Sequence, residues 1–368
     1  MKTFSGKRAI VLLSASTLMA GMFTAGEATG SAGATGSAGA TGSAGATGAS
    51  ASGPLRAHAE QQGIQIGVAV NDGLLDDAQY ADIAGTEFGQ VTAENVMKWD
   101  TLQPSQGQFD WSRADRIVEF AQQHEQRVYG HTLVWHSQTP SWVQGLGATE
   151  MDAAMADHID AVLGRYGEDV EVWDVANEVI DDNGQLRQSF WLQTLGEEYV
   201  ANAFRYARAA DPDAELCLND YNIDGINPKS DAYYQLVRDL LAQDVPITCI
   251  GFQGHLILGQ IPSDMRQNLQ RFADLGLDVY VTELDIRMDL NGETPTEQQL
   301  QQQARDYQAV VEACLGVPAC KGITTWGVHD ASSWVPDQFP GQGAPLLWND
   351  NYEPKPAYTA VHDTLATG

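Results

Sequence analysis

Eight short apolar runs alternate with longer amphipathic segments, and this alternation limits the fold of the chain more than any other feature. Runs that are apolar throughout and separated by helices are typical of parallel strands covered on both faces. The runs lie at residues 64–70, 88–92, 127–130, 170–175, 215–218, 247–252, 278–282 and 322–326. Helical segments are predicted at residues 76–84, 114–124, 151–166, 197–210, 230–243, 263–275 and 297–315. Eight such units predict an α/β fold, a closed (β/α)8 TIM barrel.

An open, doubly wound sheet is the alternative arrangement of the same elements. That fold normally carries a glycine-rich phosphate-binding turn after its first strand, and no such turn follows residues 64–70. The part of the chain from residue 54 to residue 368 has a length that suits one barrel, and its composition does not change along the way. We therefore expect a single catalytic domain over residues 54–368.

The first 53 residues have a different character. Lys2, Lys7 and Arg8 precede an apolar run, and small residues follow it, so residues 1–28 are interpreted as a secretory signal peptide. A signal anchor is the alternative. Residues 29–53 repeat glycine, serine, alanine and threonine without bulky side chains, which predicts a flexible leader. The protein is thus expected to be secreted and extracellular.

The chain is strongly acidic, with a formal charge of −29. Residues 1–53 contain three basic residues and one acidic residue, which leaves −31 for the remainder. This charge argues against nucleic acid or an anionic membrane as a partner once the signal peptide has been removed. A soluble acidic extracellular protein is one interpretation. Adaptation to high salt is the other, and it is favoured because only four lysines remain after residue 53.

Four cysteines in an exported chain predict two disulfides. Cys217 and Cys249 lie in consecutive predicted strands, and adjacent strands are about 4.8 Å apart, which suits a disulfide. Cys314 and Cys320 would then close a short loop. Three pairings are formally open, and we favour this local one. No metal-binding pattern of cysteines or histidines is found.

Polar residues and tryptophans follow seven consecutive runs, where a barrel places its active site. Two of them are glutamates, Glu178 and Glu283, each after a buried run. Two carboxylates at strand ends can perform the acid/base and nucleophilic steps of glycosidic bond cleavage. The other side chains at these ends suit a polyhydroxylated ligand, because amides and histidines bind hydroxyls and tryptophans offer flat apolar faces.

Together these motifs resemble glycoside hydrolase family 10, the endo-β-1,4-xylanases. The resemblance rests on residues 94–98, 131–138, 173–179 and 282–286, and it extends from residue 54 to residues 355–358. It implies a (β/α)8 barrel that cleaves xylan with retention of configuration. It also implies that Glu178 is the general acid/base and Glu283 the nucleophile, with their carboxyl groups about 5–5.5 Å apart.

The resemblance implies roles for the surrounding residues as well. Asn177 would hold the sugar 2-hydroxyl, and Tyr221 would lie on the leaving-group side. His255, supported by Asp285, would orient Glu283 together with Gln253. The remaining sugar-binding residues would be Glu94, Asn95, Lys98, His131, Trp135, Gln138, Trp326 and Trp334. His136 is expected to be a supporting residue, and the two cysteine pairs also match the family.

The sequence departs from the family pattern at Val179, His329 and Val335, which affects substrate preference more than reaction type. A related barrel glucanase or mannanase is the nearer alternative. A catalytically inactive carbohydrate-binding barrel is the farther one, and the presence of both glutamates argues against it.

We expect no cofactor and no metal, a monomer, and xylan or xylo-oligosaccharides as the partner. Each carboxylate should also raise the proton affinity of the other.

Overall fold

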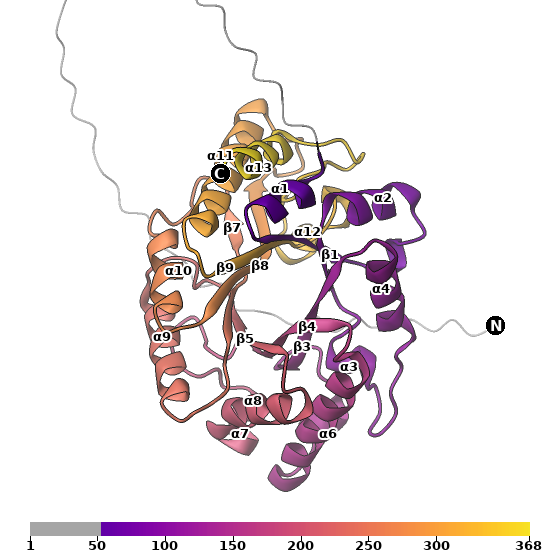
Figure 1. Ribbon diagram of the computed structural model, residues 1–368, viewed down its shortest axis with the longest axis vertical. Helices are drawn as coiled ribbons and strands as arrows, with labels where there is room; N and C mark the ends of the chain where they lie inside the picture. Colours follow the sequence, from indigo (N-terminus) through magenta and orange to yellow (C-terminus); the bar gives the residue numbers. More distant parts are fainter. Residues whose placement is uncertain (1–52) are drawn as a thin grey trace, which may run out of the picture. The chain divides into compact units, whose positions relative to one another are not determined.

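The computed structural model describes residues 53–368, so the expected signal peptide and nearly all of the leader lie outside the described residues. In the described part, eight parallel strands close into a barrel surrounded by helices (Figure 1). The barrel closes because the last of these strands pairs in parallel with both the first strand and its own predecessor. The predicted (β/α)8 architecture is confirmed. Within residues 53–368, no helix has both the length and the apolarity needed to cross a membrane.

The barrel strands follow the chain in order around the ring. They are β1 (Gln65–Val70), β2 (Gln90–Ala93), β3 (Arg127–Trp135), β4 (Val170–Asn177), β5 (Glu215–Asp220), β6 (Cys249–Phe252), β8 (Asp278–Asp289) and β9 (Cys320–Thr325). Two short strands, β7 (His255–Ile257) and β10 (Gln342–Gly343), pair with the extension of β8 beyond the ring.

Helices cover the outside of the ring. The long ones are α2 (Ala78–Glu87), α4 (Ser112–Gln123), α6 (Ala148–Tyr166), α8 (Glu198–Ala210), α9 (Pro228–Leu241), α10 (Met265–Ala273), α11 (Glu297–Leu315) and α13 (Pro356–Thr367). Shorter elements are α1 (Leu55–Gln61), α3 (Trp99–Leu102), α5 (Ser141–Gln144), α7 (Phe190–Leu195), α12 (Val335–Gln338) and the 3-10 turns η1 (Asp72–Leu74) and η2 (Asp330–Ser332). The seven predicted helical segments are found, with ends shifted by a few residues. α1 and α13 were not predicted.

Several strands are longer than the sequence predicted. β3 continues to Trp135 and β8 to Asp289, so His131, Glu283 and Asp285 lie within strands rather than after them. Register shifts beyond His131 and Val281 mark the points where these strands bend and keep pairing. The polar residues at the carboxyl ends are thus carried on paired backbone, which holds them more rigidly than loops would.

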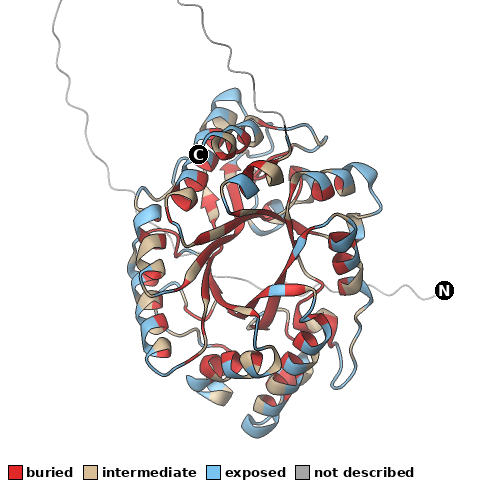
Figure 2. Cartoon of the chain, in the orientation of Figure 1, coloured by how far each residue is buried: buried red, intermediate tan, exposed pale blue. Residues whose placement is uncertain are grey.

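The buried residues form a continuous layer between strands and helices, and the exposed residues lie on the outer faces of the helices (Figure 2). The long helices pack through apolar stripes, as Val310, Val311 and Cys314 of α11 illustrate. The start of α9 is fixed by Asn227, which forms a reciprocal capping box with Ser230.

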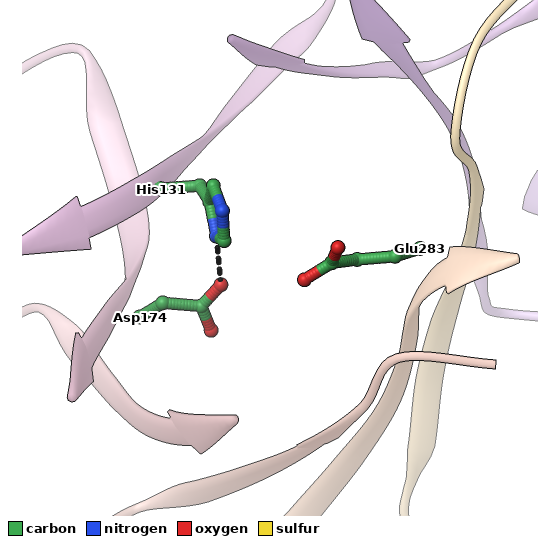
Figure 3. A group of neighbouring side chains, drawn as sticks. All are labelled: His131, Asp174 and Glu283. Carbon is green, nitrogen blue, oxygen red and sulfur yellow. Dashed lines mark hydrogen bonds and ion pairs between the residues drawn. The ribbon is translucent and has the colours of Figure 1, made fainter. Parts of the chain in front are cut away.

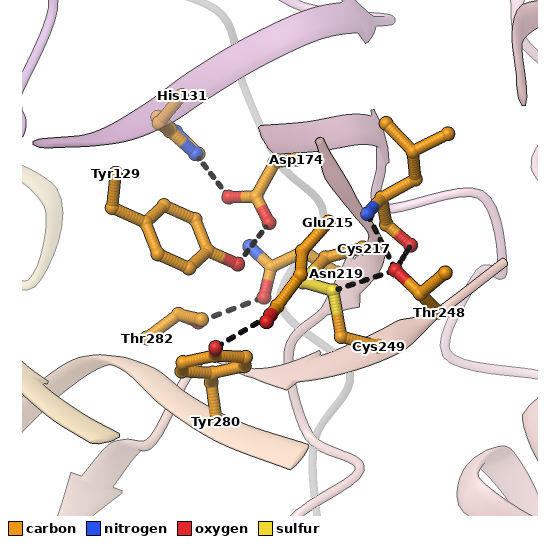
Figure 4. Close-up of a disulfide and its surroundings, with 11 residues drawn as sticks. Tyr129, His131, Asp174, Glu215, Cys217, Asn219, Thr248, Cys249, Tyr280 and Thr282 are labelled. Carbon is orange, nitrogen blue, oxygen red and sulfur yellow. Dashed lines mark hydrogen bonds and ion pairs between the residues drawn. A yellow bond between two sulfur atoms is a disulfide. The ribbon is translucent and has the colours of Figure 1, made fainter. Parts of the chain in front are cut away.

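Both predicted disulfides are present. Cys217 and Cys249 are register partners on β5 and β6, with Cα atoms 4.4 Å apart. Together with Tyr129, Val172 and Tyr280 they form a small buried cluster. Tyr129 of this cluster donates a hydrogen bond to Asp174 (Figure 4). The second disulfide joins Cys314 of α11 to Cys320 of β9.

Candidate active site

Glu178 lies immediately after β4, in a left-handed backbone conformation with φ of 57°. Its amide donates to the carbonyl oxygen of Asn219 on β5 at 2.9 Å. Its Oε1 accepts a hydrogen bond from Gln253 Nε2 at 3.3 Å, and its Oε2 lies 3.8 Å from His136 Nε2. The carboxylate is therefore aimed toward the middle of the barrel mouth and only partly exposed.

Glu283 lies in β8 and is almost fully buried. Its Oε1 accepts from Asn219 Nδ2 at 2.8 Å, and its Oε2 is 3.1 Å from His255 Nε2. His255 Nδ1 in turn lies 3.0 Å from Asp285 Oδ2. The expected support of Glu283 by His255 and Asp285 is thus present in the geometry.

The proton affinities of Glu283 and His255 are coupled. Burial opposes the charge on His255, but the carboxylates of Asp285 and Glu283 outweigh it and raise the pKa of His255 to about 10. Burial likewise works to raise the pKa of Glu283, yet the hydrogen bond from His255 and nearby positive charge hold that pKa below its usual value. Glu283 is therefore an ionised carboxylate at neutral pH. The hydrogen bond from His255 and the nearby positive charges thus outweigh burial at Glu283. The effect of the two glutamates on each other is a separate contribution, and the prediction that each raises the proton affinity of the other stays a prediction.

A chain of side-chain amides connects the two glutamates. Asn177 Oδ1 accepts from Asn219 Nδ2 at 3.0 Å and from Gln253 Nε2 at 3.2 Å. The same two amide groups also donate to Glu283 and Glu178. The carboxylates from β8 and from the end of β4 therefore belong to one hydrogen-bond network, although 105 positions separate them in the sequence.

Lys98 is the centre of a second polar group beside this pair. Its Nζ donates to Asn95 Oδ1 at 3.1 Å and to Gln138 Oε1 at 3.0 Å, and it lies 4.9 Å from the centre of a Trp135 ring. Burial lowers the pKa of Lys98, and nearby carboxylates, Glu283 first, partly offset this. Burial also raises the pKa of Glu94, the acidic residue of this group. Five of the expected sugar-binding residues thus lie together.

Two of the three predicted tryptophans of the site, Trp326 and Trp334, are packed against histidines. Trp326 meets the ring of His131 edge-on at 5.2 Å, and Trp334 lies 4.8 Å from the ring of His255. Trp334 Nε1 donates to Asp285 Oδ2 at 2.8 Å. One carboxylate therefore fixes both a tryptophan and the histidine that holds Glu283.

The sequence matches the glycosyl hydrolase family 10 over residues 54–364. Xylanase 10B from Thermotoga petrophila RKU-1, solved in complex with xylobiose, superposes with a TM-score of 0.83 at 40% identity, covering 86% of this chain and 98% of that one. The chain belongs to glycosyl hydrolase family 10. An endo-1,4-beta-xylanase of Agaricus bisporus is 44% identical over 301 residues, 81% of this chain and 90% of that protein. Endo-1,4-beta-xylanase B of Thermotoga neapolitana is 41% identical over 318 residues, with 85% and 91% covered.

One group in this family 10 barrel has the composition of a metal site. Ligand atoms of His131, Asp174 and Glu283 all lie within 4.8 Å of one another (Figure 3). The protein already uses these atoms, since His131 Nδ1 is 2.8 Å from Asp174 Oδ2 and Tyr129 donates to Asp174 Oδ1. We therefore interpret the group as support for the orientation of His131.

His136 differs from the other histidines of the family 10 site. Burial, aided by the positive charges of Arg187 and Lys229, lowers the pKa of His136 to about 3. The ring is neutral at working pH, so it places no positive charge beside Glu178. This fits the supporting role expected for it and excludes a role as a cation.

Several residues that organise the site were not among the predicted site residues. Asn219 donates to Glu283, and its own amide oxygen accepts from Thr282 Oγ1 at 2.7 Å, which fixes the amide orientation. Arg187 donates to the carbonyl oxygen of Glu178 at 2.7 Å. Asn219 follows a predicted strand and could have been chosen on that ground. Arg187 carries no such signal, because it lies on the connection after Glu178, outside every predicted strand end.

Proposed function

We propose that this family 10 protein is a secreted endo-1,4-β-xylanase that hydrolyses internal linkages of xylan with retention of configuration. The observation that carries the proposal is the network that joins an ionised Glu283 to Glu178 through Asn219, Asn177 and Gln253. Relatives that are 41–44% identical and named endo-1,4-beta-xylanases support the choice of substrate. The similar xylanase 10B of Thermotoga petrophila, solved in complex with xylobiose, supports xylo-oligosaccharides as ligands.

In the first step, a carboxylate oxygen of Glu283 attacks the anomeric carbon while the bond to the departing oxygen breaks. Glu178 gives its proton to that oxygen, so the leaving sugar departs as a neutral alcohol. Asn219 and His255 keep Glu283 ionised and oriented for this attack. A covalent glycosyl-enzyme results.

In the second step, Glu178, now a carboxylate, takes a proton from water, and the resulting oxygen attacks the anomeric carbon. The bond to Glu283 breaks, and the sugar leaves with its original configuration. The reaction returns both glutamates to their starting protonation states. Among the protein's side chains, only Glu178 gives and takes a proton in these two steps.

Substrate choice rests on the glycone side of the site. Xylose lacks the hydroxymethyl group of glucose, and Gln138 and Trp334 are the bulky side chains that we expect to exclude that group. We therefore propose that xylan is cleaved much faster than cellulose or its carboxymethyl derivative.

The test is release of reducing ends from xylan and from carboxymethylcellulose by the wild type and by Glu283→Ala. We expect rapid release from xylan by the wild type alone. Equal rates on both polymers would replace the xylanase assignment with a broader glucanase. Equal release by wild type and Glu283→Ala would remove the catalytic role assigned to Glu283 and favour a catalytically inactive, carbohydrate-binding barrel.

A further inference from the structure

Lys229 has an unusual position at the edge of the site. It lies in the first turn of α9, where the helix dipole disfavours a cation, yet its side chain is only 4% exposed. Its Nζ is 2.8 Å from Asp220 Oδ1 and 3.3 Å from the centre of the Tyr221 ring. Among residues 53–368, the ammonium group finds no well-directed hydrogen-bond partner. A second carboxylate, the exposed Asp182, lies 3.8 Å from Nζ, so the closest contacts of the ammonium are Asp220 and the face of the aromatic ring.

Tyr221 is held from its other end by Arg187. Arg187 Nη2 donates to the tyrosine hydroxyl oxygen at 2.9 Å, and the guanidinium carbon lies 5.6 Å from the ring centre. One ring face is thus covered by Lys229 and the hydroxyl is fixed by Arg187. Tyr221 is half-buried, and a sugar would stack on a part of the ring that Lys229 does not cover.

Arg187 also holds the segment that carries Glu178. Its Nε donates to the Glu178 carbonyl oxygen at 2.7 Å, and Nη2 donates to the Ile180 carbonyl oxygen at 3.1 Å. Glu178 itself is in the left-handed backbone region, which an L-residue adopts only when its surroundings hold it there. One guanidinium group thus connects the tyrosine to the backbone of the expected proton donor.

We propose that Lys229 and Arg187 are positioning residues that fix Tyr221 as a rigid platform for the first sugar on the leaving-group side. This inference rests on the proposed function and names the residues that prepare one part of the site. A ring that is already immobilised loses little freedom when a sugar stacks on it, so the binding of the leaving-group sugar is strengthened. Because Arg187 contacts both Tyr221 and the Glu178 backbone, it also fixes the position of the proton donor relative to that sugar.

The test compares two substrates that differ on the leaving-group side. Xylohexaose places sugars there, whereas p-nitrophenyl β-xylobioside does not. The variant is Asp220→Asn with Lys229→Met, which removes both charges and leaves no buried carboxylate without a partner. We expect KM for xylohexaose to rise about 10-fold, as loss of a desolvated cation–π contact implies, and KM for the aryl xylobioside to change less than twofold.

The matched control is Asp330→Asn with Lys355→Met, which removes the other buried lysine–aspartate pair, 2.9 Å apart. It should leave the ratio of the two KM values unchanged. Tyr221→Phe and Arg187→Met should each raise KM for xylohexaose, and the double variant should be no worse than the single ones. Folding of each variant is checked by its thermal unfolding transition.

An unchanged KM ratio in the Asp220/Lys229 variant, or the same ratio change in the control, would overturn the inference while leaving the xylanase intact. Additive effects of Tyr221→Phe and Arg187→Met would overturn the part played by Arg187. A wild type that cleaves neither substrate would instead overturn the proposed function, and the platform with it.

Discussion

At the scale of single residues, the reactivity of Glu283 depends on two neighbours, of which His255 contacts Glu283 and Asp285 contacts His255. Asp285 keeps the proton on His255, and the protonated His255 keeps Glu283 ionised. A carboxylate this deeply buried would otherwise retain its proton and lose its nucleophilicity. The pH range over which the enzyme works is therefore set in part by a histidine that takes no part in bond making.

Replacement of His255 by glutamine tests whether protonated His255 keeps Glu283 ionised at acidic pH. The amide can still donate a hydrogen bond to Glu283 but carries no charge, so the pKa of Glu283 should rise. The acid limb of kcat/KM for p-nitrophenyl β-xylobioside should move to higher pH. Because the pKa of Glu283 is lowered by folding, its contribution to stability is present above the usual value of 4.5 and is lost as pH falls further. His362→Gln, a buried histidine bonded to Gly53 and Asp363, should leave the limb in place.

The proton on His255 can be followed directly by histidine side-chain NMR. The wild-type ring should keep its proton until pH approaches about 10, and Asp285→Asn should lower that value. Since folding raises the pKa of His255, its stabilising contribution is present below its ordinary value of 6.5 and disappears as pH rises through about 10. A wild-type ring that loses its proton near 6.5 would contradict the proposed chain of contacts.

The sequence could identify Glu178 and Glu283 because each follows a buried apolar run and has no packing role there. It could not identify the bonds that make them act together. Whether Asn219 turns its amide toward Glu283 depends on the pleat of β5 and on Thr282 from another strand. Such cross-strand contacts follow from the closed ring and from no local pattern.

At the scale of elements, the alternation of apolar runs and helical segments sufficed to predict the barrel, but the strand ends were underestimated. The sequence turns polar at His131 and Glu283, which ordinarily marks the end of a strand. β3 and β8 nevertheless continue, because their neighbours supply backbone partners past that point. The first and last helices were missed although α13 shows a helical spacing of buried residues at Ala357, Val361 and Leu365.

The two disulfides differ in the length of chain that they close, 32 positions for Cys217–Cys249 and 6 for Cys314–Cys320. Loop-closure entropy then predicts that removal of the first costs about 3–4 kcal/mol of unfolding free energy and removal of the second about 2 kcal/mol. Paired alanine substitutions, compared by urea unfolding, measure the difference. An equal loss in both would show that residual structure in the unfolded chain, rather than loop length, controls their effect.

At the scale of the whole molecule, most of the lysines after residue 53 are buried whereas many carboxylates are exposed. Of the four lysines within residues 53–368, Lys98, Lys229 and Lys355 are buried and act in polar clusters, which leaves Lys321 as the partly exposed one. Carboxylates are instead spread over the outer faces of the helices. For example, Glu197, Glu198 and Asp239 line one groove between α8 and α9. Repulsion among such groups destabilises the folded state in dilute buffer and is screened by salt.

We therefore propose salt adaptation, and expect the unfolding free energy to rise as sodium chloride is raised from about 0.01 to 1 M, where the screening length falls from about 30 to 3 Å. Glu197→Gln with Asp239→Asn removes two of the charges that line the groove and should weaken this dependence without changing activity. The measurement is urea unfolding at each salt concentration, with sodium sulfate at equal ionic strength as a second series. Screening depends on ionic strength, whereas exclusion of sulfate from the surface stabilises most folded proteins whatever their charge. Full stability at low salt, or a dependence unaltered by the double substitution, would assign the acidic surface to solubility alone.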